Sequence, residues 1–122
     1  MTDEAALRAR SPREVLEDHL ALRKGSNLDD DIRRNYDRGV VLLSLTAARH
    51  GHAGVREMAD ELQRDCAGND YEYDEIRVND EVGMLVWSAR CPEGTINDGT
   101  DSYIVRDGRI AVQTVHYHVR RG

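Results

Sequence analysis

One acid and two histidines fall at alternate positions of the predicted C-terminal hairpin, where together they could transfer protons. Asp107-Gly108 is a two-residue turn signal, so the hairpin register is expected to place Asp101 opposite Thr114. Side chains two residues apart share a face of a strand. The predicted face therefore contains Val105, Tyr103, Asp101, Ile110, Val112, Thr114, His116 and His118. A β-bulge would exchange the two faces beyond its own position.

Asp101 and His116 form the predicted catalytic pair. A carboxylate orients a neighbouring imidazole and raises its pKa, which gives a general base near neutral pH. The alternative is structural, with Asp101 satisfying a buried backbone or hydroxyl group. We expect the surrounding pocket to be lined by His19, Tyr36, Trp87, Tyr103, Val112, Thr114 and His118. The aromatic side chains among these could equally fill the core.

Other polar patterns in the chain give no clear site. His116 and His118 share a strand face and could chelate a metal, but they lie near the C-terminal end of the chain. His50 and His52 fall in a predicted loop. We therefore predict no bound metal and no cofactor. The run 29–31 is three aspartates without calcium-loop spacing, which we interpret as the solvated start of a helix.

Composition excludes several classes of partner. The chain has 122 residues and a net charge of −6, so it lacks the basic surface that binds nucleic acid or an anionic membrane. It contains no apolar run of the roughly 20 residues that cross a bilayer. Cys66 and Cys91 are interpreted as two lone thiols, with a disulfide as the less favoured alternative. This composition predicts a cytoplasmic protein.

The order of predicted elements is typical of an α+β fold. Residues 1–10 are expected to be a disordered leader, and residues 11–122 a single domain. Ser11-Pro12 and Glu14 predict a capped helix that ends at Gly25. Further helices are predicted over 27–36 and 54–66, a buried strand over 40–45, and later strands over 71–78, 82–91, 100–106 and 109–119. Helices would then cover one face of an antiparallel sheet.

The strand predicted over 82–91 is apolar on both faces. Val82, Met84 and Val86 alternate with Leu85, Trp87 and Ala89. An antiparallel strand with one solvated face would instead alternate apolar and polar residues. We therefore expect one face to be covered by helices or a cavity and the other by a second subunit.

Several stretches make the chain resemble the nuclear transport factor 2-like superfamily, and within it the SnoaL-like group. They are residues 36–44 (YDRGVVLLS), 51–58 (GHAGVREM), 99–110 (GTDSYIVRDGRI) and 113–117 (QTVHY), and the resemblance covers about residues 12–119. It implies a cone-shaped, curved antiparallel sheet wrapped over three helices, a pocket inside the cone, and homodimers that pack through the outer sheet face.

The resemblance leaves function open, because one fold supports many activities. Asp101 is similar in position to an acid of the ketosteroid isomerase branch, but that branch also has a base carboxylate after its first strand. Leu42, Leu43 and Ser44 occupy this region here. We therefore carry two hypotheses. The first is an acid–base enzyme or binder for a small, largely apolar organic ligand, and the second is a non-catalytic homodimeric module.

Overall fold

The computed structural model describes residues 2–122, which form four helices and seven strands. The helices are α1 (Thr2–Arg8), α2 (Pro12–Lys24), α3 (Leu28–Asn35) and α4 (Gly51–Asp65). The strands are β1 (Tyr36–Leu43), β2 (Ala48–His50), β3 (Asp70–Asn79), β4 (Val82–Cys91), β5 (Gly94–Arg106), β6 (Arg109–His116) and β7 (Arg120–Arg121). This confirms the predicted α+β class. None of the helices in the described chain has the length and apolar character needed to cross a membrane.

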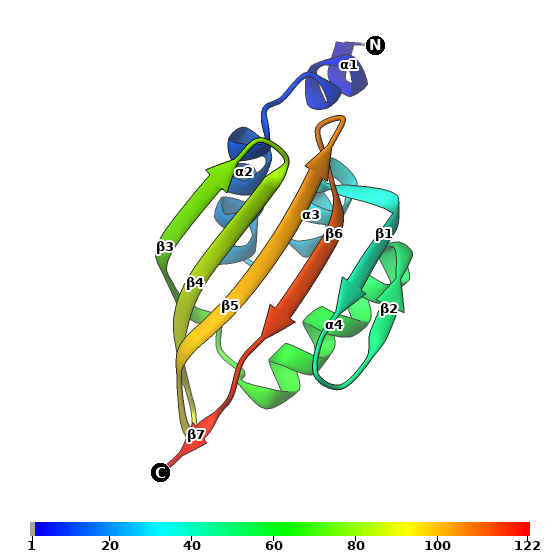
Figure 1. Ribbon diagram of the computed structural model, residues 1–122. Coiled ribbons are helices and arrows are strands. Elements are labelled where there is room, and N and C mark those ends of the chain that lie inside the picture. The colour runs from blue at the N-terminus through cyan, green and yellow to red at the C-terminus, as the bar shows by residue number, and fades with distance from the viewer. Residues whose placement is uncertain (1) are drawn as a thin grey trace.

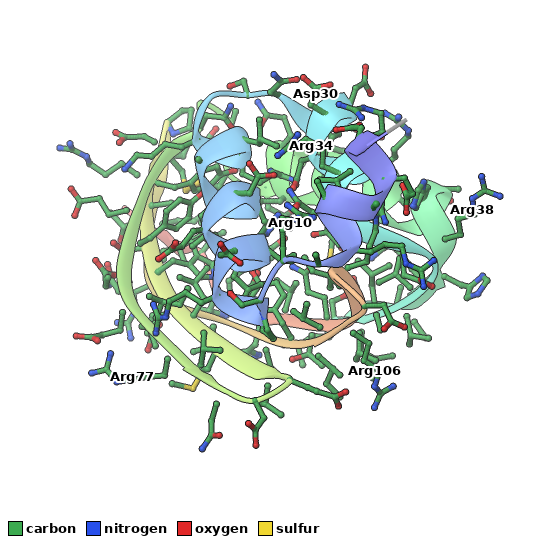
Figure 2. The ribbon with its side chains drawn as sticks, turned by 90° about the horizontal axis from the view of Figure 1, so that it is seen from above. Arg10, Asp30, Arg34, Arg38, Arg77 and Arg106 are labelled. Atoms are coloured by element: carbon green, nitrogen blue, oxygen red, sulfur yellow. A yellow bond between two sulfur atoms is a disulfide. The ribbon has the colours of Figure 1, made fainter. Side chains whose placement is uncertain are left out.

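The sheet is long, mixed and strongly curved. Its strands lie in the order β2-β1-β6-β5-β4-β3, with β7 added beside β5. All neighbours are antiparallel except β1 and β6, which are parallel. Irregular register occurs in four of the strand pairs, β1–β6, β3–β4, β4–β5 and β5–β6. Bulges bend a sheet locally, and the sheet accordingly wraps around α2, as the view from above shows (Figure 2).

Helices α2, α3 and α4 lie against the concave face of this sheet, and α1 lies beyond its end, beside the N-terminus (Figure 1). The capping box predicted for α2 is present: the Ser11 side chain accepts from the Glu14 backbone N–H, and the Glu14 carboxylate accepts from the Ser11 N–H. The predicted Asp107-Gly108 turn is also present, with positive φ at both residues. The core that results contains Leu16, Ile32, Val40, Leu42, Leu85, Trp87 and Ile96.

Three local features differ from the expectations. The strand predicted over 40–45 starts earlier, at Tyr36, and is buried on one face only, leaving Val41 and Leu43 about 40% and 44% exposed. Residues 2–8 form a helix where a disordered leader is expected, and Leu7 is buried. The third predicted helix begins at Gly51, just after the short strand β2.

Arg10 secures the N-terminal segment to the rest of the fold. Its guanidinium donates to Asn35 Oδ1 at 2.8 Å and to the carbonyls of Arg34 and Gly108 at 2.7 and 3.0 Å. In Figure 2 Arg10 points in among the helices, whereas Arg77 and Arg106 lie on the outer side of the sheet. One side chain thus joins the start of the chain to α3 and to the β5–β6 turn.

The two cysteines are joined, so the interpretation as lone thiols is wrong. A Cys66–Cys91 disulfide links the C-terminal end of α4 to the end of β4, with the two Cα atoms 4.7 Å apart. Persistent disulfides are typical of oxidising compartments. The cytoplasmic location therefore stays a prediction, and this bond argues against it.

Candidate functional site

A cavity lies between the concave face of the sheet and helices α2 and α4. Its volume is about 70 Å³. A single water needs roughly 10–15 Å³ by this measure, so the space holds several waters or part of a small organic molecule. Most of the wall is apolar, with Leu20, Leu42, Val55, Met58 and Leu85 among the lining residues. The polar and aromatic residues of the wall are His19, Arg23, Asp101, Gln113 and five tyrosines, Tyr36, Tyr71, Tyr73, Tyr103 and Tyr117.

Asp101 is a buried carboxyl group in this wall, with 8% of its surface exposed. It accepts three hydrogen bonds, each 3.0 Å long, from Trp87 Nε1, the Tyr103 hydroxyl and Gln113 Nε2. The Gln113 amide oxygen in turn accepts from the Tyr36 hydroxyl. Because every partner donates, the arrangement suits the ionised carboxylate.

Burial and hydrogen bonding act on the Asp101 pKa in opposite directions. Loss of hydration favours the neutral acid and is the larger effect. The donors Trp87, Tyr103 and Gln113 and the nearby His19 favour the carboxylate. The net result is a pKa raised above the ordinary aspartate value. A raised pKa makes the carboxylate a stronger base.

A second buried acid stands behind the cavity wall. The Asp31 side chain is fully buried, and its carboxylate contacts His19 Nδ1 at 2.8 Å and accepts from Asn35 Nδ2 at 2.9 Å. His19 is itself only 4% exposed. Asp31 therefore fixes the tautomer of His19, with the proton on Nδ1 and Nε2 turned toward the cavity side.

The Tyr103 hydroxyl connects the two acids. It lies 3.0 Å from Asp101 Oδ2 and 3.4 Å from His19 Nε2. Burial raises the pKa of Tyr103 well above its ordinary value, and the charge of Asp101 adds to that rise. The phenol therefore stays protonated and donates to Asp101 Oδ2, while the lone pair of His19 Nε2 lies 3.4 Å from the same hydroxyl. A continuous buried polar chain results, from Asp31 through His19 and Tyr103 to Asp101.

Five of the predicted site residues come together around the cavity: His19, Tyr36, Trp87, Asp101 and Tyr103. His116 does not join them, and the expected Asp101–His116 pair is wrong in its geometry. His116 and His118 are exposed, and Val112 and Thr114 lie half-buried on the opposite face of β6. Asp101 pairs with Val115 in the ladder, and not with Thr114.

The cause is one extra residue near the start of β6. Val105 pairs with Ile110 as predicted, but Ile104 pairs with Val112, so Ala111 has no partner opposite. A bulge of this kind exchanges the two faces of the strand beyond it. Gln113, Val115 and Tyr117 consequently line the cavity in place of the residues expected there.

Two members of the buried polar network are absent from the predicted site. The predicted hairpin register places Gln113 on the outer face, and the aspartate run 29–31 predicts a solvated Asp31. The face of α3 carries a signal for Asp31, because Leu28, Asp31, Ile32 and Asn35 recur at helical spacing and all four are buried or half-buried. The sequence offers no comparable signal for Gln113.

Neither histidine pair of the sequence lines the cavity. His52 Nε2 lies 2.9 Å from the Tyr36 carbonyl oxygen, and His50 is the N-cap residue of α4. Over residues 2–122, no three histidine, cysteine or acidic side chains gather in a way that could hold an ion.

Comparison with solved structures identifies the fold. An NTF2-like protein of unknown function from Burkholderia xenovorans LB400 superimposes with a TM-score of 0.74 at 14% identity, covering 91% of this chain and 85% of that one. A candidate polyketide cyclase from Sinorhizobium meliloti gives 0.69 at 17% identity, covering 84% and 93%. A candidate ketosteroid isomerase from Kribbella flavida DSM 17836 gives 0.74 at 10% identity, covering 91% and 80%.

Sequence comparison adds nothing to this. No protein-family model matches the chain, and no curated protein matches it. At these identities the structural likeness establishes architecture alone. The chain has the nuclear transport factor 2-like fold, which it shares with NTF2-like and SnoaL-like proteins of known structure.

Proposed function

We propose that the protein binds a small, largely apolar organic molecule in the cavity and transfers a proton to or from it, with Asp101 as the acid–base group. The observation that carries the proposal is a buried carboxylate in a mostly apolar wall, with three hydrogen-bond donors and a raised pKa. Buried titratable groups of this kind are concentrated at functional sites. The likeness to a candidate cyclase and a candidate isomerase is consistent with such chemistry.

The buried polar chain gives the abstracted proton a place to go. Once Asp101 has taken a proton from the ligand, the acid donates to the Tyr103 oxygen, and Tyr103 passes its own proton to His19 Nε2. His19 becomes an imidazolium ion held by the Asp31 carboxylate. Asp101 is thereby restored as a base, and the reverse sequence returns the proton to the product.

The sheet wall beside Asp101 limits the reaction types, because Leu42 pairs with Gln113, the hydrogen-bond partner of Asp101. Leu42 lines the cavity at the strand where an isomerase of the two-acid type would need its second carboxylate. One acid–base group with a relay suits enolisation, cyclisation or elimination next to a carbonyl group. Such steps need a proton removed from carbon and later returned, which one group can do in turn.

Hydrogen exchange tests the proposal without knowledge of the substrate. Wild-type protein in D₂O is expected to catalyse exchange of the α-hydrogens in members of a panel of small cyclic ketones, such as 2-tetralone, followed by NMR. Asp101→Asn should slow that exchange by roughly 10²-fold or more, because general base catalysis contributes about 10²–10⁴-fold.

The matched control is Asp98→Asn, an exposed acid of the same strand, which should leave the exchange rate unchanged. Equal exchange rates in wild type and Asp101→Asn would remove Asp101 from the mechanism. Absence of catalysed exchange across the panel would count against the enzymatic role and favour a binding function.

The second candidate is a non-catalytic homodimeric module, and the outer face of the sheet favours it. Val82 pairs with Ile104, Ile104 with Val112, and Val112 with Val41, so apolar side chains cross four strands in one row. A parallel row contains Met84 and Leu43, which are 42% and 44% exposed. An exposed apolar row of this kind can pack against its own copy about a twofold axis.

Sedimentation velocity tests this second function. We expect the native chain to sediment as a dimer and Val41→Glu as a monomer, because a charge within an apolar interface is desolvated without a partner. Leu45→Glu is the control, since Leu45 is 76% exposed in a loop outside the two rows. A native monomer would overturn the dimer.

A further inference from the structure

We propose that the ligand of the cavity carries a carboxylate or similar anionic group, and that Arg23 on α2 binds it at one end of the cavity. This inference rests on the proposed ligand-binding function. It adds the chemical class of the ligand and the direction in which the ligand lies.

Arg23 occupies the same helix face as His19. The two residues are four positions apart in α2, so their side chains lie one above the other. Both line the cavity, with His19 buried and Arg23 half-buried. One face of α2 therefore carries both His19, which belongs to the buried polar chain, and Arg23, whose guanidinium solvent and ligands can reach.

Arg23 differs from the other half-buried arginines in having no counter-ion. Arg10 and Arg34 both contact Asp18, Arg49 contacts Glu61, and Arg109 contacts Glu4. Arg23 makes no ion pair and no side-chain hydrogen bond to any residue whose side chain the structure describes. A half-buried guanidinium has lost part of its hydration, so it gains from an anionic partner that is brought to it.

The field of Arg23 reaches several groups of the cavity wall. Burial raises the pKa of Tyr36, Tyr71 and Tyr73, and the positive charge of Arg23 opposes that rise at all three hydroxyls. The Lys24 ammonium adds a second cation on this side, 5.5 Å from the centre of the Tyr73 ring. One side of the cavity is therefore electropositive.

The opposite charges of Asp101 and Arg23 orient the ligand. An anionic group would be repelled by the Asp101 carboxylate and attracted by Arg23. The carboxylate of the ligand therefore lies beside Arg23, and its apolar part extends over the leucine, valine and methionine side chains toward Asp101. A guanidinium binds a carboxylate through two parallel hydrogen bonds, which fixes this direction.

Matched acids and esters test the inference. Trp87 is the single tryptophan of the chain and lines the cavity, so its fluorescence reports binding there. The probes are benzoate, cinnamate and 3-phenylpropionate with their methyl esters. The acids should bind roughly tenfold or more tightly than the esters, because hydrogen bonds to charged groups are the stronger kind. Arg23→Gln should abolish this preference without weakening the esters by more than about twofold.

Two further variants separate charge from structure. Arg23→Lys should keep part of the preference for the acids, because it keeps the charge without the paired donors. Arg13→Gln, an exposed arginine of the same helix, should change nothing. Two results would overturn the inference of an anionic ligand and leave the proposed ligand-binding function standing. They are esters that bind as tightly as acids, and a preference for acids that survives in Arg23→Gln. Absence of binding by every probe would overturn the proposed ligand-binding function as well.

Discussion

Asp31→Ala is expected to lower the free energy of unfolding by about 2–6 kcal/mol, because two buried donors lose their acceptor at a cost of about 1–3 kcal/mol each. The Asp31 carboxylate has no exposed surface, and it is the partner of both His19 Nδ1 and Asn35 Nδ2. Its loss leaves both of these donors buried without an acceptor. Urea unfolding followed by far-UV circular dichroism measures the change.

The control is the neighbouring acid. Asp30 has a side chain about half exposed, and it lies 3.7 Å from Arg33 in a surface ion pair. Such pairs contribute about 0–1 kcal/mol, so Asp30→Ala should have little effect. Asp31→Asn keeps the shape and one acceptor oxygen, and we expect a smaller loss than for alanine. A loss below about 1 kcal/mol in Asp31→Ala would contradict the buried pair.

The same pair links stability to the proposed chemistry. Asp31 belongs to α3, His19 to α2 and Tyr103 to β5, so one polar chain joins two helices to the sheet. Satisfied buried networks hold their members in one geometry. His19 is therefore kept within reach of Tyr103 by packing and hydrogen bonding together, and not by the cavity alone.

The parts of this fold that the sequence predicted depend on local chemistry. The capping box of α2 and the Asp107-Gly108 turn require only residues within a few positions of one another. The two-residue period of β4 separates Leu85 and Trp87 from Val82 and Met84, and the structure buries the first set. These short-range patterns were sufficient to place Asp101, Tyr103 and Trp87 on one concave surface.

The errors arose where a position depends on distant parts of the chain. The bulge at Ala111 exchanged the two sides of β6, which moved Gln113 inward and His116 outward. No turn residue marks this bulge. Asp31 was assigned to solvent because three successive aspartates are typical of a helix start, although only two of them are exposed or half-exposed there. The helical spacing of apolar and buried positions in α3 predicts the burial of Asp31 better than the run of aspartates does.

The disulfide is a third feature that depends on distant parts of the chain. Cys66 and Cys91 are 25 residues apart, and their contact requires the end of α4 to meet the far end of the β3–β4 hairpin. The β3–β4 hairpin makes that meeting, because Asp70, four residues after Cys66, pairs with Arg90, the neighbour of Cys91. The two sulfur atoms are thus brought together by strand pairing, and not by residues next to either cysteine.

Removal of this disulfide should destabilise the protein by about 3.5 kcal/mol, the loop-closure entropy for its sequence separation. The bond restricts the unfolded chain, so the Cys66→Ala/Cys91→Ala variant should unfold at lower urea concentration than the oxidised wild type. Replacing two packed sulfur atoms adds a cavity cost to that figure, since Cys66 is fully buried.

Reduction separates the two contributions. Wild-type protein unfolded with dithiothreitol keeps both cysteine side chains and loses only the bond, so its shift gives the entropic part. The double variant should be insensitive to the reductant, which makes it the internal control. Titration of two free thiols in the denatured, unreduced wild type would show that the bond does not form. Equal urea midpoints with and without reductant would show that it forms without stabilising the fold.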